Sequence, residues 1–576
     1  MRNLTRRFML GAAATLLGVA PGSGSSAGPS AALTIERRKI QIGRRRADAV
    51  LVNGSLPGPT LRFREGEVVS ITVTNRMDQP TSIHWHGVRV PSDMDGVPGL
   101  SFHGIAPGET FVYRFELHQS GTYWYHAHTD GQEQEGLYGA FIIEPADGWA
   151  EAFEREHIVM LSDWTDETPA RIVHNLKTRP DHYNRGQRTL GTFAADVARQ
   201  GLAATLADRV AWGEMRMSPT DLADVTGATY DFLMNGQTAE ANWTALCRIG
   251  ERVRLRVINA SSMTFFDVRI PGLKLRVVEA DGNDLVPLEV DEFRIGPAET
   301  YDVIVRPTAS AHTIFAQTLD RSGFARGTLA TSPGLAAPVP ALDPRPLRTM
   351  ADMGMDHGAH GGHAGHVMPP GAAPNAHAGH ATGAPANGAM DHAAMGHGSG
   401  GPLPVTENRP SAGAVGVDNI AETTWSDLDR PGIGLAGNGR RVLTYADLKA
   451  RLPGADPRPP SREIVLHLTG NMQRYIWGFD GRRMEDTGPL ELRVDERVRI
   501  TLVNDTMMEH PVHLHGLWSE LENAHGEFRP YKHTIIVQPA QRVSFLVTAD
   551  EPGAWAFHCH LLYHMALGMM RTVLVA

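Results

Sequence analysis

Cysteine is scarce in this chain of 576 residues, which has only Cys247 and Cys559. Two cysteines cannot build the disulfide framework that stabilises small secreted domains. The body of the chain also lacks an apolar run long enough for a membrane-spanning helix. A formal net charge of −10 argues against a nucleic-acid partner. The remaining composition is typical of a globular protein. The chain is too long for a single hydrophobic core, and its length predicts about three to four domains.

The first residues predict an export signal rather than a folded element. Arg6 and Arg7 precede a short apolar run at 10–20, and small residues follow around Ala27. Twin arginines before such a run are typical of a Tat signal peptide, and a Sec signal is the alternative. We expect residues 1–31 to be this signal, with cleavage near Ala27 or Ala31, and the mature protein to lie outside the cytoplasm.

A strand-like segment occurs three times, at 67–75, 251–259 and 496–504, each running from a glutamate to an asparagine eight residues later. Alternating β-branched residues between turn signals predict strands. Gly- and Pro-rich turns without strong long helices favour antiparallel β-sandwiches. We therefore expect an all-β protein with domains at 32–147, 150–340 and 456–576. A partly helical insertion is expected at 188–225, and a long, largely disordered connection at 341–455.

Paired histidines follow the repeat in the first and third domains but not in the second. Nine residues after Asn75 and Asn504 come His84/His86 and His513/His515, and a later block adds His126/His128 and His558/His560. Alternate residues of a strand share one face, so each pair presents two imidazoles together. One such pair is commonly a pair of satisfied core histidines. Four pairs in one register indicate a metal site.

Copper fits these side chains best, because imidazole and thiolate dominate and the motifs contain no carboxylate. Eight imidazoles from two homologous domains suit a cluster of three copper ions between those domains. Cys559 points to the opposite face from His558 and His560. With His510, His564 and a weak thioether ligand it predicts an electron-transfer copper site. Met569 is the preferred thioether, and Met565 and Met570 are the alternatives. Cys559 would also link the two centres through the chain, which makes it a predicted catalytic residue.

Four motifs resemble the signatures of multicopper oxidases: His84-Trp85-His86-Gly87, His126-Ala127-His128, His510-Pro511-Val512-His513-Leu514-His515-Gly516 and the run from His558-Cys559-His560 to Met569. Segments 92–99, 132–139, 504–508 and 518–522 resemble CopA-type copper-resistance oxidases of the bacterial periplasm. The resemblance implies three cupredoxin domains, each a Greek-key β-sandwich. It also implies four copper ions as cofactors and a periplasmic location.

The resemblance further implies a ligand set for each ion. The type 1 copper takes His510, Cys559, His564 and Met569, and the type 2 copper takes His84 and His513. The type 3 pair takes two sets of three histidines, namely His86, His126 and His560 on one ion and His128, His515 and His558 on the other.

The implied reaction couples one-electron oxidation of Cu(I), or of a phenol, to four-electron reduction of dioxygen to water. Asp95 matches an acidic position of the family, and we expect it to donate protons. An ordinary Asp-Gly turn is the alternative for this residue. Met565 stands where some relatives carry a second acid, which leaves the proton route open. We expect a monomer that works with periplasmic copper-handling proteins.

Methionine and histidine crowd residues 350–397, among glycine and alanine. Thioethers favour Cu(I) and imidazoles bind Cu(II), so this segment is predicted to gather copper, with an inert linker as the alternative. Three other functions compete for the whole chain: a general laccase-like phenol oxidase, a copper-sequestering periplasmic protein and a copper nitrite reductase. The last normally has a thiolate in its first domain, where this chain has Ala127. Cys247 is expected to be a buried apolar thiol.

Overall fold

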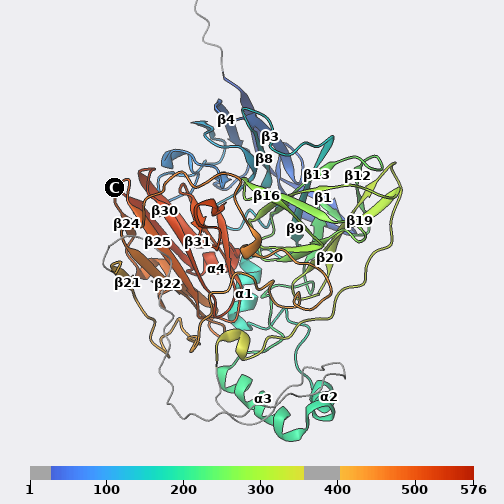
Figure 1. Ribbon diagram of the computed structural model, residues 1–576, viewed down its shortest axis with the longest axis vertical. Helices are drawn as coiled ribbons and strands as arrows, with labels where there is room; N and C mark the ends of the chain where they lie inside the picture. The colour runs from blue at the N-terminus through green and yellow to red at the C-terminus, as the bar shows by residue number, and fades with distance from the viewer. Residues whose placement is uncertain (1–27, 356–401) are drawn as a thin grey trace, which may run out of the picture.

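The computed structural model describes residues 28–355 and 402–576, which form three two-sheet β-sandwiches (Figure 1). The predicted all-β fold is confirmed. In the first domain the two sheets have the strand orders β2-β1-β4-β6 and β3-β8-β7-β5. Its elements are β1 (Ser30–Ile42), β2 (Arg45–Val52), β3 (Gly58–Arg64), β4 (Val68–Asn75), β5 (His84–His86), the 3-10 turn η1 (Ser92–Met94), β6 (Thr110–Glu116), β7 (Gly121–His126) and β8 (Tyr138–Glu144).

The second domain carries the main helices. Its sheets have the orders β11-β10-β9-β13-β18-β15-β16 and β12-β20-β19-β14-β17. Its elements are β9 (Arg155–Trp164), α1 (Pro169–Thr178), α2 (Leu190–Gln200), α3 (Leu202–Met215), β10 (Asp231–Met234), β11 (Gln237–Thr238), β12 (Trp243–Leu246), β13 (Val253–Asn259), β14 (Phe266–Arg269), β15 (Leu275–Ala280), β16 (Asn283–Val290), β17 (Glu292–Ile295), β18 (Thr300–Val305), β19 (Ala311–Thr318) and β20 (Phe324–Ala330).

The third domain contains the strands that end the chain. Its sheets have the orders β21-β22-β25-β30-β27-β28, with β23 paired to β22, and β24-β32-β31-β26-β29. Its elements are β21 (Val405–Glu407), β22 (Glu463–Asn471), β23 (Ile476–Phe479), β24 (Leu490–Leu492), β25 (Arg497–Asn504), β26 (His510–Leu514), β27 (Ser519–Leu521), β28 (Tyr531–Lys532), β29 (Thr534–Val537), β30 (Arg542–Thr548), β31 (Gly553–Cys559), α4 (Leu562–Ala566) and β32 (Met570–Val575).

The sheets are mixed, so the expectation of antiparallel sandwiches needs correction. In each domain one earlier strand runs parallel to the repeat strand, as β1 does with β4, β9 with β13 and β22 with β25. The opposite sheets also contain parallel pairs, namely β3 with β8, β12 with β20 and β24 with β32. Alternation of apolar residues fixes which face is buried but carries no information about strand direction.

The asparagine of each repeat closes the turn that follows the repeat strand. Asn75, Asn259 and Asn504 are fully buried at the ends of β4, β13 and β25. In each case the side-chain amide donates to two backbone carbonyls, and the side-chain oxygen accepts from the backbone N–H two residues later. This Asx turn fixes the start of the next strand. In the first and third domains that strand carries histidine pairs.

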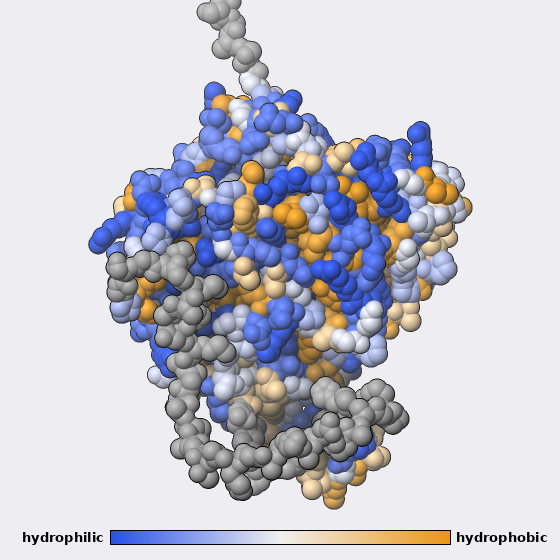
Figure 2. Space-filling model, viewed as in Figure 1, coloured by the Kyte–Doolittle hydropathy of each residue, from blue (hydrophilic) through white to orange (hydrophobic). Residues whose placement is uncertain are grey.

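The helical insertion predicted at 188–225 is present as α2 and α3, whereas α1 was not predicted. Thr168 caps α1, and Pro169 occupies its first turn, where proline needs no hydrogen-bond partner. Helices α2 and α3 project from the body of the molecule (Figure 1) and expose apolar side chains at its lower tip (Figure 2). The exposed side chains are Leu190, Leu202, Leu206 and Val210.

The expected disordered connection needs correction at both of its ends. Strand β21 lies inside it yet pairs with β22 in the third domain, ahead of the predicted boundary at 456. Val442, Leu443 and Leu448 are buried, and Leu443 N–H donates to Glu292 O of the second domain at 3.0 Å. Residues 341–355 and 402–455 therefore help to join the second and third domains. The predicted Met/His segment is described only as far as residue 355.

The first domain begins slightly earlier than predicted. Ser30 and Ala31 already pair with Ser70 and Ile71 of β4, so cleavage after Ala31 would remove the start of β1. Residues 1–27 of the predicted signal lie outside the described residues. Across the described parts of the chain, no helix is long and apolar enough to cross a membrane.

His467 ties the connection to the third domain and makes stability depend on pH. Its Nδ1 lies 2.7 Å from Asp505 Oδ2 and its Nε2 3.1 Å from Glu407 Oε1 on β21. Burial lowers the pKa of His467, but the two carboxylates outweigh burial, so the pKa is raised. A raised folded-state pKa stabilises the fold below the unfolded-state pKa of about 6.5, and this contribution is lost as the pH rises through the folded-state value.

We expect His467→Gln to lower the melting temperature most at acidic pH. Hydrogen bonds to charged groups contribute roughly 1.5–3 kcal/mol, and 1 kcal/mol corresponds to about 2–4 °C in a domain of this size. Thermal unfolding of the copper-loaded protein from acidic to alkaline pH would check this. The difference from wild type should shrink as the pH rises. His118→Gln, on a largely exposed side chain, is the control. A difference that does not change with pH would contradict the prediction.

Candidate metal centres

Eight histidines from the first and third domains converge between the two sandwiches. Three groups have nitrogen atoms within 4.8 Å of one another: His84, His513 and His515; His86, His126 and His560; and His128, His515 and His558. The second and third groups are the two sets that the resemblance implied for the type 3 ions. The first group contains the implied type 2 pair, His84 and His513.

Strand pairing explains how these side chains meet. His84 on β5 lies opposite His126 on β7, and His513 on β26 lies opposite His558 on β31. The two pairs face each other across the domain boundary. His558 Nε2 is 3.3 Å from His128 Nε2 of the first domain and 3.0 Å from His515 Nε2. Neither domain alone holds a complete set of nitrogens.

Buried carboxylates hold several of these rings in one orientation. His515 Nδ1 donates to Asp95 Oδ2 at 2.8 Å, and His84 Nδ1 donates to the Asp95 backbone carbonyl at 2.9 Å. His126 Nδ1 lies 2.7 Å from Glu133 Oε2. A metal-bound histidine characteristically donates its other ring N–H to a carboxylate or carbonyl, which fixes the tautomer and the ring orientation. Asp95 spans the domain boundary in this way.

Five of the nitrogens that face the cluster are buried and lack partners. Among the described residues, nothing hydrogen-bonds Nε2 of His84, His86, His126, His513 or His560. Burial, with the neighbouring imidazoles, holds the pKa of His86, His126, His128, His513, His515 and His560 well below the usual value, and burial lowers the pKa of His558 to about 4. Neutral imidazoles with free nitrogens are the state that binds metal ions, so these residues fit copper.

A second, separate site contains the thiol. Cys559 Sγ lies 3.5 Å from His510 Nδ1 and 3.8 Å from His564 Nδ1, and the two nitrogens are 3.2 Å apart. All three residues are buried. Burial raises the pKa of the Cys559 thiol well above its usual value. A bound metal ion would deprotonate the thiol, as it does for coordinating thiols generally. One thiolate and two imidazoles are the donors of an electron-transfer copper site.

The outer nitrogens of this second site also have partners. His510 Nε2 lies 2.7 Å from Thr506 Oγ1, and His564 Nε2 lies 2.8 Å from Asp224 Oδ2. Trp477 stacks on the His564 ring at 3.6 Å between ring centroids. Asp224 comes from the second domain, inside the predicted insertion. The second domain thus positions His564 through Asp224. In the described parts of the chain, no side chain of the second domain itself belongs to a group of clustered metal donors.

The position of Met569 favours it over its alternatives. Met569 is fully buried, whereas Met565 and Met570 are partly exposed. Its N–H donates to His564 O at 2.9 Å, and its carbonyl accepts from Cys559 N–H at 3.0 Å. Met569 therefore lies beside two of the predicted type 1 ligands. Its role as the axial ligand stays a prediction.

The two centres share strand β31 and the residue that follows it. Cys559 belongs to the thiol site, and its chain neighbours His558 and His560 each belong to a different group of the histidine cluster. The structure therefore has the predicted alternation, with Cys559 on one face of the strand and His558 and His560 on the other.

Sequence reasoning missed Glu133, Asp224 and Thr506. It also missed His533, which has a nitrogen within 4.8 Å of nitrogens of His86 and His513. Glu133 lies in segment 132–139, which resembles the copper-resistance oxidases. Its spacing from His126 in the sequence did not indicate that the two side chains are in contact. Asp224 lies in an insertion, and His533 lies outside every motif. Cys247 is buried in the apolar core of the second domain, as predicted.

Comparisons with known proteins agree with this geometry. Three family profiles described as multicopper oxidase match residues 34–148, 155–333 and 457–576. A copper resistance protein A from Escherichia coli is 52% identical over 567 residues, covering 96% of this chain and 94% of that protein. One from Pseudomonas syringae pv. tomato is 56% identical over 559 residues, covering 94% and 92%.

Solved structures share the fold. Fet3p, a multicopper oxidase that functions in iron import, superimposes with a TM-score of 0.64 at 19% identity, covering 95% of this chain and 90% of that chain. A laccase from Botrytis aclada gives a TM-score of 0.61 at 19% identity, covering 95% and 87%. Since all three sandwiches match, the chain belongs to the multicopper oxidases, oxygen-consuming oxidoreductases that use four copper ions, one of type 1, one of type 2 and a type 3 pair.

Proposed function

We propose that this enzyme oxidises Cu(I) to Cu(II) as part of copper resistance. In this proposal His510, Cys559, His564 and Met569 hold the type 1 copper, and the eight paired histidines hold the type 2 and type 3 ions in the sets given above. Four Cu(I) ions, one dioxygen and four protons would yield four Cu(II) ions and two waters. The high identity to proteins named copper resistance protein A supports this substrate.

One observation carries the choice of Cu(I): the described start of the Met/His segment, residues 350–355, packs against the apolar core that contains Cys559. A Cβ added at Gly354 would lie 2.8 Å from Ala540 Cβ, and Ala540 N–H donates to Asn504 O at 2.9 Å. The Asn504 turn then leads through Thr506 to His510. Gly354, inside this segment, therefore reaches the Asn504 turn through one intermediate residue, Ala540. That turn supports His510, a proposed type 1 ligand.

Several methionines belong to the apolar core that also contains Cys559. Met353, Met472, Met507, Met508 and Met569 are buried in one apolar cluster with Cys559, and Met350 and Met355 pack against it. Thioethers are soft donors that favour Cu(I) over Cu(II). Soft donors in the core that holds the electron-accepting site would favour Cu(I) over a bulky organic donor.

When bound, the four copper ions supply the storage of four electrons that complete reduction of dioxygen requires. The chain's own residues set the geometry. Cys559 is joined covalently to His558 and His560, which gives a through-bond path between the centres. Asp95 and Glu133 hold imidazoles of the cluster in place. The proton-donor role expected for Asp95 stays a prediction, to be tested by the pH dependence of oxygen turnover in Asp95→Asn.

Export by the Tat route to the periplasm belongs to the same proposal. The twin arginines at Arg6 and Arg7 support it, and periplasmic copper-handling proteins would then be the partners that deliver Cu(I). A laccase-like oxidation of phenols is the second candidate function.

Steady-state oxygen uptake with Cu(I) and with a simple phenol tests the function. We would compare wild type with a variant in which every methionine and histidine of residues 356–397 is replaced by serine. This variant preserves the length of the connection and spares Met353, which is buried. Tethered copper sites raise the local concentration of substrate, so we expect uptake at low Cu(I) to fall about 10-fold in the variant.

Oxidation of the phenol should stay within a factor of about two, because no tethering is involved. Equal losses with both substrates would indicate a damaged enzyme rather than a lost copper-gathering segment. Phenol turnover without Cu(I) turnover in wild type would favour the general phenol oxidase. Copper binding without oxygen uptake would favour sequestration.

A further inference from the structure

Helix α3 carries a row of exposed apolar side chains on its outer face. Leu202, Leu206 and Val210 are 55%, 46% and 56% exposed. Residues four apart lie above one another on a helix, so these three side chains form one outer stripe. Leu190 at the start of α2 is 88% exposed and adds a fourth apolar side chain to the hairpin that α2 and α3 form. Exposed apolar side chains grouped in this way mark a surface for association, whereas single ones do not.

The inner side of this hairpin is fixed by contacts of its own, so the outer stripe is preformed. Arg209 on α3 pairs with Asp196 on α2 at 2.8 Å, and its guanidinium lies over the Phe193 ring. Thr205 and Trp212 share this inner face of α3 and are buried. The hairpin projects from the body of the molecule (Figure 1), so the outer stripe lies away from the three sandwiches, at the apolar tip in Figure 2.

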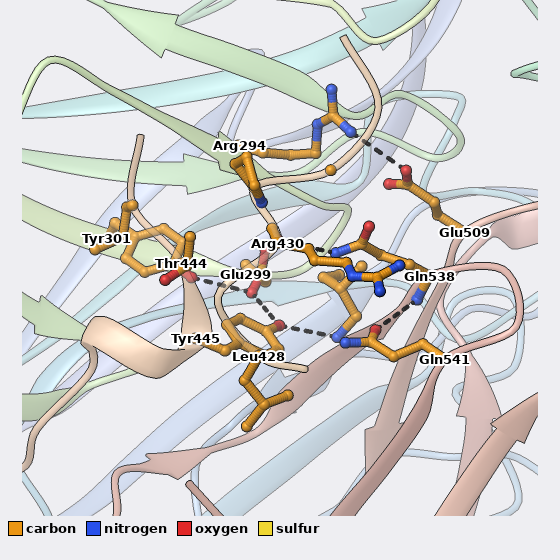
Figure 3. Close-up of a pocket in the computed structure, with 14 residues that line it drawn as sticks. Arg294, Glu299, Tyr301, Leu428, Arg430, Thr444, Tyr445, Glu509, Gln538 and Gln541 are labelled. Carbon is orange, nitrogen blue, oxygen red and sulfur yellow. Dashed lines mark hydrogen bonds and ion pairs between the residues drawn. The ribbon is translucent and has the colours of Figure 1, made fainter. Parts of the chain in front are cut away.

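The cavity between the second and third domains is a poorer candidate for a binding surface, because groups that line it pair with one another. Glu299 and Tyr445 point towards each other in Figure 3, and Tyr445 O–H donates to Glu299 Oε1 at 2.8 Å. Arg294 Nη1 lies 3.2 Å from Glu509 Oε1 across the same cavity. A ligand there would compete with these internal pairs, whereas the outer stripe of α3 has no such contacts to replace.

The charges at the two ends of α3 oppose its own dipole. Its first turn contains no acidic residue, and Gly201 at the N-cap supplies no side-chain cap. Arg199, with a side chain that is 66% exposed, adds positive charge at the same end. The last turn contains the exposed Glu214 and no basic residue, and Arg216 at the C-cap donates to Gln473 of the third domain at 2.9 Å. Helix dipoles favour negative charge at the N-terminus and positive charge at the C-terminus, so both ends of a lone α3 are unfavourable.

A second copy of α3 in antiparallel orientation would correct both ends at once. Glu214 continues the outer stripe, since it follows Val210 by one turn. If two stripes pair about their common midpoint, Leu206 packs against the partner's Val210, and the partner's Glu214 lies beside Leu202 in the first turn of α3. The carboxylate then meets the uncapped N-terminus and comes within reach of Arg199. In a two-fold symmetric pair each of these contacts occurs twice.

We propose that two copies of this protein associate through α3 as an antiparallel, two-fold symmetric pair. The outer stripe supplies the apolar contact, and the partner's Glu214 supplies the negative charge that the N-terminus of α3 lacks. This association is independent of the oxidase reaction and differs from the monomer expected from the sequence. One helix from each copy forms a small interface, so the association is reversible, with a dissociation constant on the order of micromolar.

Analytical ultracentrifugation of the copper-loaded full chain tests the association. Over roughly 1–200 µM we expect the weight-average mass to rise from one chain towards two. Leu206→Lys places two ammonium groups in the apolar contact and should weaken association at least about 10-fold. Leu452→Lys is the matched control, since Leu452 is an exposed leucine outside the hairpin, and it should associate like wild type. A wild-type mass of one chain throughout this range would overturn the proposal.

Charge reversal distinguishes the antiparallel pair from other modes of association. Arg199→Glu leaves acidic residues on both sides of the terminal contact, and Glu214→Lys leaves basic residues on both sides. Each variant alone should associate about 3- to 10-fold more weakly than wild type at low salt. An equal mixture of the two should recover wild-type association, because each copy then meets the opposite charge at both contacts. No recovery in the mixture would contradict the antiparallel arrangement.

Glu214→Lys also separates association from folding. A basic residue in the last turn suits the dipole of α3, so the melting temperature at low protein concentration should equal or exceed that of wild type while association weakens. A lower melting temperature would overturn the charge argument. Two further results would show another occupant of the outer stripe and defeat the proposal: binding of monomeric wild type to phosphatidylglycerol vesicles, or self-association only after the methionines and histidines of 356–397 are replaced by serine.

Discussion

Replacing Cys559 by serine should abolish oxygen uptake with Cu(I) and with phenols, while the protein keeps its fold and three of its four copper ions. The thiol lies buried between His510 Nδ1 and His564 Nδ1. A serine hydroxyl has a similar size but stays protonated at neutral pH and is a poor ligand for copper. Without a type 1 ion, no electron reaches His558 or His560 along the chain. We expect a loss of about 1,000-fold or more, comparable to removal of a catalytic group.

Three measurements on this variant distinguish lost chemistry from lost structure. The intense blue absorption of the copper–thiolate bond should vanish, copper analysis should give one ion per chain fewer than in wild type, and the melting curve should stay cooperative. Cys247→Ser is the control, since Cys247 is the other buried cysteine and lies in the core of the second domain. It should keep its colour and its turnover. Residual turnover near the wild-type rate in Cys559→Ser would show that electrons bypass this residue.

The sequence predicted those parts of the site that depend on short-range geometry. The repeat asparagines Asn75 and Asn504 close turns within their own domains, so the strands that follow start in a fixed register. Alternation along a strand then places His513 and His515 towards the cluster. Each step involves residues close in sequence or in neighbouring strands. This is why the sequence alone could predict which histidines belong to the cluster, whereas their division among the copper ions came from the family resemblance.

The partners of the ligands could not be predicted because domain docking creates them. Asp224 and His564 are 340 residues apart, and Asp95 and His515 are 420 apart. Asp95 was found only through family resemblance, and its contacts were not foreseen. No periodicity within one strand encodes a contact between sandwiches.

The connection before the third domain shows the limit of composition. Its high content of glycine, alanine and proline predicted disorder. Yet Leu435, Val442, Leu443 and Leu448 are spaced among polar residues, and all four are buried. These side chains have no core of their own and gain one from the surfaces of two sandwiches. A cluster of aliphatic residues at 435–448 was the signal that average composition concealed.

His558→Gln should produce the opposite defect from Cys559→Ser, although the two residues are adjacent. His558 lies in the histidine cluster, where its Nε2 is within 3.3 Å of His128 Nε2 and 3.0 Å of His515 Nε2. Glutamine lacks an imidazole nitrogen and cannot replace a copper ligand there. Because side chains alternate along β31, the substitution leaves the thiol site untouched. The variant should therefore stay blue, and Cu(I) should bleach it.

Reoxidation separates the two variants. In His558→Gln the bleached type 1 copper should not regain its colour in air, and steady-state oxygen uptake should fall by about 1,000-fold or more, as for loss of a catalytic group. His157→Gln, on β9 of the middle domain and bonded to Leu246 O, should reoxidise like wild type. Rapid return of colour in His558→Gln would mean that oxygen is reduced without this histidine. The two phenotypes differ because the two faces of β31 serve different centres. Cys559→Ser should lose electron uptake, and His558→Gln should lose oxygen reduction.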